Sequence, residues 1–238
     1  MTEDLIKKLT GKNKPDFEFA AQHLVDSADV EMFKALVEKD DFLFDFVKEN
    51  VAQRIANAVN EGNYENLLKF LEFYSPSYDE VIISSLAKFA DEDLTDEMLE
   101  LFENGNNAQK TYCAKYFAYI QDPLSIEFLK KNSYTEDDFL NSNCASTLGV
   151  MREESSYNEA LEKLKTGDEF EQLKAVKFLG AYGNPEAIPY LIEVMKTSTM
   201  SENIAGEIPY LADIFSILEQ DKEGGLLVIN NIVNGLGE

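Results

Sequence analysis

A pattern of apolar residues recurs along this chain at intervals of 31 positions, and such a recurrence predicts a stack of similar structural repeats. The clearest repeat covers residues 168–195, where the sequence Gly-Asn-Pro at 183–185 signals a turn between two runs of helical period. The second run forms one apolar stripe, made of Ile188, Leu191, Ile192 and Met195. Two short amphipathic helices joined by a tight turn predict an antiparallel helical hairpin.

Six consecutive repeats share this register without an insertion between them. One position of the first helix is occupied by Ala20, Val51, Ile82, Cys113, Cys144 and Ala175. One position of the second helix is occupied by Leu36, Leu67, Met98, Leu129, Ala160 and Leu191. The fourth repeat departs from the pattern, because Lys130 and Ser133 stand where the second stripe requires apolar residues. We therefore expect its second helix to be short, or frayed after Leu129.

A single hairpin of about 30 residues has too small a core to fold alone, so each stripe must be buried against neighbouring hairpins. We expect an all-α solenoid of about seven antiparallel hairpins that forms one domain over residues 1–238. Regular repeats cover about residues 13–198, and the looser pattern of residues 199–238 predicts an irregular capping hairpin. The shared position of Cys113 and Cys144 favours core packing over a disulfide. Gly149 and Gly180, inside helical runs, indicate close approach of neighbouring helices.

The charge of the chain excludes several classes of ligand. It carries 21 Lys and Arg residues against 45 Asp and Glu residues, a formal net charge of −24. Such a chain repels the phosphates of nucleic acids and of anionic membranes, so we expect neither as a partner. No apolar run approaches the roughly 20 residues of a membrane helix, and the first residues lack the apolar core of a secretory signal. We expect a cytoplasmic protein.

The residue types that catalytic, metal and cofactor sites need are sparse. His23 is the one histidine, and with two cysteines, Cys113 and Cys144, the chain lacks the ligands of a zinc site. No phosphate-binding loop, dinucleotide fingerprint or nucleophile elbow occurs. A Ser-His-Asp triad would have to use His23, for which we expect a satisfied surface or partly buried position. Carboxylates abound, but no pair stands in an apolar setting, so we predict no catalytic residue, metal ion or cofactor.

The segment AVKFLGAYGNPEAIPYL at residues 175–191 resembles the HEAT-like repeat family. It has alanine in the first helix, glycine near the turn, and Pro-x-Ala-Ile-Pro-x-Leu opening the second helix; residues 106–136 and 137–167 match more weakly. The resemblance implies a right-handed superhelix whose second helices line a concave, protein-binding surface. It also implies an alternative, because some short-repeat members are similar to phycobilin lyases. Most repeats here lack the basic residue and acidic partner that often punctuate the family's helices.

If second helices face the concave side, the residues between their buried positions form the binding surface. Steps of 31 along the chain place seven candidates there, which we call the ridge: Tyr190, Glu193, Glu159, Glu162, Phe128, Glu97 and Glu100. The same count adds Lys131, Asn66 and Lys69. The carboxylates would attract a basic peptide or helix, and the two aromatic side chains would anchor it. The alternative is a solvated face that keeps an acidic protein soluble.

Two further aromatic groups need an interpretation. Residues 42–47, FLFDFV, lie between the first and second repeats, and Phe46 shares its register position with Phe139 and Phe170. We therefore expect packing between repeats, whereas an exposed Phe42 or Phe44 would mark a contact patch. Three tyrosines of one first helix are expected to be half-buried with solvated hydroxyl groups, namely Tyr112, Tyr116 and Tyr119.

These observations predict a non-catalytic scaffold or adaptor that binds a basic or amphipathic segment of a partner protein on an acidic concave face. One alternative is a phycobilin-lyase-like enzyme or enzyme subunit, which would need a pigment-sized cleft with converging polar groups. A second alternative is a purely structural repeat domain of a larger assembly.

Overall fold

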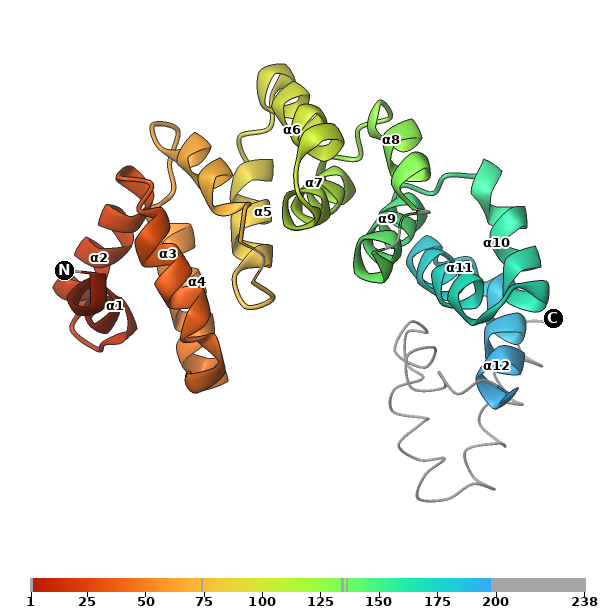
Figure 1. Ribbon diagram of the computed structural model, residues 1–238, viewed down its shortest axis with the longest axis horizontal. Coiled ribbons are helices and arrows are strands. Elements are labelled where there is room, and N and C mark those ends of the chain that lie inside the picture. Colours follow the sequence, from red (N-terminus) through yellow and green to blue (C-terminus); the bar gives the residue numbers. More distant parts are fainter. Residues whose placement is uncertain (1, 74, 134, 136, 198–238) are drawn as a thin grey trace. The chain divides into compact units, whose positions relative to one another are not determined.

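The computed structural model describes residues 2–73, 75–133, 135 and 137–197, and these residues form helices joined by turns, without a β-strand (Figure 1). The α-helices of this part of the chain are α1 (Thr2–Thr10), α2 (Lys14–Asp26), α3 (Val30–Glu38), α4 (Asp45–Ala58), α5 (Asp79–Ala87), α6 (Glu92–Asn104), α7 (Asn107–Ile120), α8 (Ser125–Asn132), α9 (Asp138–Val150), α10 (Ser155–Thr166), α11 (Glu169–Tyr182) and α12 (Ile188–Thr197). Its 3-10 helices are η1 (Asp40–Phe42), η2 (Tyr64–Phe70) and η3 (Pro185–Ala187). The all-helical prediction is confirmed for the described residues.

The chain divides into two compact units, unit 1 (Met1–Ile120) and unit 2 (Gln121–Glu238). In unit 1 the first helices of successive repeats pack in chain order, α2 on α4, α4 on α5 and α5 on α7. In unit 2 the corresponding contact joins α9 to α11, and the second helices α10 and α12 also touch. Within each unit, a second helix packs against the first helix of the following repeat, as α6 does on α7 and α10 on α11.

The register positions read from the sequence lie in the core of their units. The six residues of the first-helix position, from Ala20 to Ala175, are each at most 4% exposed. The six residues of the second-helix position, from Leu36 to Leu191, are each at most 8% exposed. Neither Cys113 nor Cys144 forms a disulfide, and both are buried, which confirms their packing role. A spacing of 31 residues therefore returns each apolar side chain to an equivalent buried site.

The repeat that spans α11 and α12 has the local signals that its sequence predicts. Asp168 accepts a hydrogen bond from the Glu171 backbone N–H, and the Glu171 side chain accepts one from the Asp168 backbone N–H, a reciprocal cap that fixes the start of α11. The helix ends at Gly183, whose φ of 70° lies in the left-handed region that glycine tolerates. Leu191 and Ile192 of α12 are buried.

Gly149 allows α9 and α11 to approach closely, as predicted from its place in a helical run. A Cβ atom at this position would overlap the backbone carbonyl oxygen of Phe178 and lie 3.0 Å from the backbone nitrogen of Tyr182. Both of those atoms belong to α11, which packs against α9. Only a residue without a side chain leaves room for this contact.

Several sequence expectations about aromatic residues are wrong. Phe46 is 61% exposed and Phe139 is 50% exposed, so neither is a core knob, while Phe170 is half-buried. The reason is visible in α4, which begins at Asp45 but buries no residue before Val51, so its first turn extends beyond the core. Tyr112 and Tyr116 are fully buried, and only Tyr119 is exposed. The Tyr112 hydroxyl donates to the Phe73 carbonyl oxygen at 3.2 Å.

The fourth repeat has the short second helix that its sequence predicts, but this helix does not fray after Leu129. Helix α8 has eight residues and continues to Asn132, and the Ser133 hydroxyl donates to the Lys130 carbonyl oxygen at 2.8 Å. In the second repeat the second helix is the 3-10 helix η2, which still buries Leu67.

The expected capping hairpin at residues 199–238 lies outside the described residues. None of the helices that the structure describes combines the length and the apolar character needed to cross a membrane.

Candidate functional site

The ridge residues are distributed over both units. Glu97 and Glu100 lie on α6 of unit 1, and both side chains are exposed. The other five ridge residues belong to unit 2, where Phe128 lies on α8, Glu159 and Glu162 on α10, and Tyr190 and Glu193 on α12. All five ridge carboxylates are exposed.

The two ridge aromatics are less available than the prediction requires. Phe128 and Tyr190 are half-buried. The Lys165 ammonium nitrogen lies 3.8 Å from the centroid of the Tyr190 ring, a cation–π contact that joins α10 to α12. Tyr190 therefore already has a packing role within unit 2.

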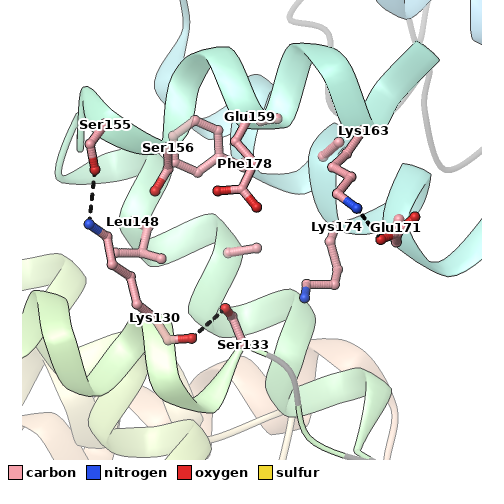
Figure 2. Close-up of a pocket in the computed structure, with 13 residues that line it drawn as sticks. Lys130, Ser133, Leu148, Ser155, Ser156, Glu159, Lys163, Glu171, Lys174 and Phe178 are labelled. Carbon is pink, nitrogen blue, oxygen red and sulfur yellow. Dashed lines mark hydrogen bonds and ion pairs between the residues drawn. The ribbon is translucent and has the colours of Figure 1, made fainter. Parts of the chain in front are cut away.

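A cavity of about 440 Å³ lies among four helices of unit 2 (Figure 2). Helices α8, α9, α10 and α11 contribute its lining, which consists of Lys130, Ser133, Ala145, Leu148, Ser155, Ser156, Glu159, Ala160, Lys163, Glu171, Lys174, Ala175 and Phe178. Its volume lies in the range typical of small-molecule sites. Among the ridge residues, Glu159 alone lines it, and Figure 2 shows the Glu159 side chain extending from α10 into the site.

The apolar wall of the cavity is built from register positions. Leu148, Ala160 and Ala175 belong to the positions that recur every 31 residues, and Phe178 adds an aromatic ring. Ala160 is the one alanine at a second-helix position that elsewhere holds leucine or methionine. Because alanine is smaller than leucine or methionine, Ala160 leaves a space beside α10. In the other repeats the larger side chain at this position would fill that space.

One edge of the cavity is a polar network between α8 and the start of α10. The Lys130 ammonium donates to the Ser155 hydroxyl at 2.9 Å and lies 3.3 Å from a carboxylate oxygen of Glu153 (Figure 2). Burial alone would raise the pKa of Glu153, but hydrogen bonds from Ser156, Ser155 and Lys130 outweigh it and lower that pKa to about 2. The edge is therefore a fixed network of charged hydrogen bonds.

Lys174 places a cationic group in the wall of the cavity. Its side chain is 8% exposed, and its ammonium nitrogen lies 5.5 Å from the centroid of the Phe170 ring. Burial lowers the pKa of Lys174 to about 8, although the charges of Cys144, Glu171 and Glu159 act to raise it. Lys163 lines the same cavity and forms an ion pair with Glu171.

His23 lies in the last turn of α2, with a serine and an aspartate of the connection to α3 beside it. Its Nε2 atom is 3.3 Å from an Asp29 carboxylate oxygen, and its Nδ1 atom is 3.5 Å from the Ser27 hydroxyl. The other oxygen of Asp29 caps α3 by accepting from the Met32 backbone N–H at 3.0 Å. These contacts give His23 a structural role at the turn, which agrees with the partly buried position expected for it.

Unit 1 carries an exposed group of three phenylalanines, Phe42, Phe44 and Phe46, which we call the aromatic patch. Phe42 is 85% exposed and Phe44 is 74% exposed, and the rings of Phe44 and Phe46 stack with their centroids 6.0 Å apart. The aromatic character of residues 42–47 predicts packing between repeats, but the exposures of Phe42, Phe44 and Phe46 favour the alternative, a contact patch.

Sequence reasoning missed the cavity, although its signals were present. Lys130 and Ser133 interrupt the apolar stripe of the fourth repeat, and both line the cavity. Lys174 gave no such signal, because its own register position already holds polar residues in the two preceding repeats, Asn143 and Tyr112. Within the residues that the structure describes, no cluster of His, Cys, Asp or Glu is arranged to hold a metal ion.

Comparison with known proteins supports the family resemblance seen in the sequence. Residues 172–197, which run from within α11 through the Gly183 turn to the end of α12, match the family model of the PBS lyase HEAT-like repeat. No curated protein matches the chain. The matched segment contains the left-handed turn at Gly183 and begins directly after the reciprocal cap of Asp168 and Glu171. Residues 172–197 therefore form a repeat of the HEAT-like family.

Proposed function

We propose that this chain is a non-catalytic scaffold that binds a basic, amphipathic segment of a partner protein. In this proposal about seven hairpins stack into a right-handed solenoid that holds the binding surfaces rigid. The HEAT-like match of residues 172–197 supports a repeat scaffold, and the buried register positions support stacked hairpins.

The observation that carries the proposal is the exposure of the aromatic patch. Phe42, Phe44 and Phe46 lie within five residues and are all more than half exposed. Fully burying one such side chain in an interface contributes roughly 1.5–3 kcal/mol. Aromatic side chains are also enriched among the residues that dominate binding energies. The apolar face of an amphipathic helix is a suitable occupant for such a patch.

The charges around the patch favour a basic partner. Residues 38–49 contain five carboxylates and two lysines. Both lysines already face carboxylates, since Lys39 lies 3.7 Å from Glu3 and Lys48 lies 3.6 Å from Asp45. The excess of carboxylates repels an anionic membrane surface and attracts a basic peptide.

The ridge keeps a supporting role in this proposal. Its exposed carboxylates, Glu97 and Glu100 on α6 and Glu159 and Glu162 on α10, add to the attraction of a basic segment at low ionic strength. Because Tyr190 and Phe128 are half-buried, the proposal assigns the anchoring contacts to the aromatic patch instead.

The test uses a synthetic helical peptide with leucines on one face and lysines on the other, titrated by calorimetry into the full chain. Replacing Phe42, Phe44 and Phe46 by serine should weaken binding at least tenfold, because the peptide loses apolar contacts worth more than 1.4 kcal/mol. The matched control is Phe19→Ser, since Phe19 is 60% exposed on α2 of the same unit.

Two further arms separate apolar contact from charge. A scrambled peptide of the same charge, without an apolar face, should bind the wild type and the triple variant equally. Reversing the charges of Glu97, Glu100, Glu159 and Glu162 should weaken both peptides and reduce the salt dependence of binding. Equal affinity of the wild type and the triple serine variant for the amphipathic peptide would refute the patch as the site. For the lyase-like alternative, coexpression with an apo-phycobiliprotein and bilin should increase the adduct.

A further inference from the structure

The cavity of unit 2 has the volume of a small-molecule site. The residues that line it are not explained by the scaffold role. Its wall is apolar on α9 and α11, where Ala145, Leu148 and Phe178 are buried. A surface that only contacts a partner does not require a cavity of about 440 Å³, and Ala160 leaves space that leucine or methionine fills at the equivalent position of the other repeats.

The cavity reverses the charge balance of the whole chain. Three lysines line it, Lys130, Lys163 and Lys174, and they come from three different helices. Two glutamates line it, Glu159 and Glu171, although acidic residues outnumber basic ones by 45 to 21 in the sequence. Lysines of α8, α10 and α11 therefore converge on one space in an otherwise acidic protein.

Lys174 is the most buried of the three lysines that line the cavity. Its side chain is almost fully buried, and taking an ammonium group out of water is costly unless negative charge lies nearby. The groups that act on it include Glu159 and Lys163 of α10, Glu171 of its own helix and Cys144 of α9. The pKa of Lys174 still falls to about 8, because burial outweighs these neighbouring charges. An added anion in the cavity would stabilise the protonated amine.

The lining also limits which anion fits. With three lysines and two glutamates, the lining has a net charge of one positive unit, which a group with one negative charge neutralises and a group with two, such as a phosphate, exceeds. The apolar wall favours a ligand whose remaining atoms are hydrocarbon or aromatic. We propose that the cavity binds a small monocarboxylate with an apolar body, with its carboxylate against Lys174 and its body against Leu148, Ala160 and Phe178.

The experiment titrates 3-phenylpropionate and hexanoate into the full chain at pH 7, followed by calorimetry and by amide chemical shifts. The neutral alcohol 3-phenylpropan-1-ol serves as the ligand control. Lys174→Met keeps the side-chain volume but removes the charge, and it should weaken binding of both acids at least tenfold. Lys177→Met changes a lysine of the same helix that does not line the cavity, and it should leave the affinity within twofold of the wild type.

A second variant tests the space rather than the charge. Ala160→Leu restores the residue type found at this register position in four other repeats, so it should fold and fill the cavity. Binding of both acids should then be lost, while the thermal melting curve shows a cooperative transition. If Ala160→Leu does not fold, Lys174→Met still decides the proposal.

The pH dependence gives a readout that exposed lysines would not produce. The protonated fraction of an amine with a pKa of about 8 falls about tenfold between pH 7 and pH 9, so the affinity for the acids should fall about tenfold. Exposed lysines, with pKa values near 10.4, would keep the affinity constant over this range.

Three results would overturn the proposal: no binding of either acid to the wild type, equal affinity for the acids and the alcohol, or unchanged affinity in Lys174→Met. A final arm uses a capped peptide with one aspartate between apolar residues. Binding of the peptide without binding of the free acids would also overturn the proposal, and would assign the cavity to a carboxylate of a protein partner. None of these outcomes bears on the aromatic patch, which lies in unit 1.

Discussion

Lys174 is a lysine at a core-facing position of α11, one residue before the buried Ala175. At the equivalent position of the fourth repeat stands Tyr112, a neutral side chain that is fully buried. A charged amine at this position reduces the stability of the folded chain, because its hydration is lost on folding. Such a cost is often retained at sites where the group acts on a ligand.

The sign of this effect predicts how stability depends on pH. The pKa of Lys174 falls from 10.5 to about 8 on folding, so between these values the unfolded chain binds more protons. The free energy of unfolding should therefore rise with pH across this window, relative to a variant that lacks the amine. Lys174→Met should be more stable than the wild type at pH 7, by on the order of 1–3 kcal/mol.

Urea unfolding at pH 7.0 and at about pH 10 measures both quantities. The comparison is the difference between the wild type and Lys174→Met, because other lysines and tyrosines titrate equally in both proteins. A lower stability of Lys174→Met at pH 7 would show that the ammonium group is well stabilised where it lies.

The two cysteines illustrate what burial does to a reactive group. Both Cys113 and Cys144 are fully buried, and burial raises the pKa of the Cys113 thiol. A protonated, inaccessible thiol is a poor nucleophile, so Cys113 acts as a small apolar side chain between helices.

At the scale of the helix, Gly149 determines how closely α9 and α11 pack, and the start of α4 determines which of its residues are exposed to solvent. Gly149 permits contact between the backbones of α9 and α11, which together position Leu148, Lys174 and Phe178 around the cavity. In α4 the first turn extends beyond the core, so Phe46 lies away from the buried residues that begin at Val51. Phe44 directly precedes the helix and lies beside Phe46. Both sites therefore depend on where a helix begins or how closely it packs.

Gly149→Ala should destabilise unit 2 by about 1–3 kcal/mol or more, because the added methyl group meets the backbone of α11 rather than a movable side chain. Gly183→Ala is the matched control in the same unit. A Cβ at Gly183 meets nothing within 4 Å, and its cost of about 1–2 kcal/mol comes from the left-handed backbone alone.

Thermal unfolding and amide hydrogen exchange distinguish the two variants. Gly149→Ala should speed exchange in α9 and α11 together, whereas Gly183→Ala should affect the end of α11. Equal protection of α9 in the wild type and in Gly149→Ala would mean that the helices separate without loss of stability.

For the molecule as a whole, the formal charge of −24 acts on every surface at once. Like charges spread over a folded chain repel one another and lower its stability, and dissolved salt screens that repulsion. Ion pairs such as Lys8 with Asp4 have the opposite salt dependence, but exposed pairs contribute little.

We therefore expect the melting temperature to rise by several degrees when the ionic strength increases from about 0.01 M to about 0.15 M, as the screening length falls from about 30 Å to about 8 Å. Replacing Glu97, Glu100 and Glu103 of α6 by glutamine should raise the melting temperature at low salt and reduce its salt dependence. Calorimetry at the two ionic strengths measures both effects. A melting temperature that falls with salt would mean that ion pairs outweigh the repulsion.

The 31-residue register and the apolar residues at its repeating positions could be predicted from the sequence alone, although Phe46 and Phe139 were wrongly expected in the core. Those properties follow from local periodicity, because an apolar side chain every third or fourth residue must face a neighbouring helix, and equal spacing returns it to an equivalent place. Ala20, Cys144 and Leu191 could thus be assigned to the core before any coordinates were known.

Which departures from the register meet in space depends on how the helices pack, and no local pattern encodes that packing. Lys130, Ala160 and Lys174 lie on three helices, and their convergence on one cavity depends on how α8, α10 and α11 pack. Likewise, the exposure of Phe42 and Phe46 depends on where the core contacts of α4 begin, which the aromatic character of the segment does not encode. Periodicity specifies a side chain's direction around its own helix, whereas cavities and exposed patches arise from the distances between helices.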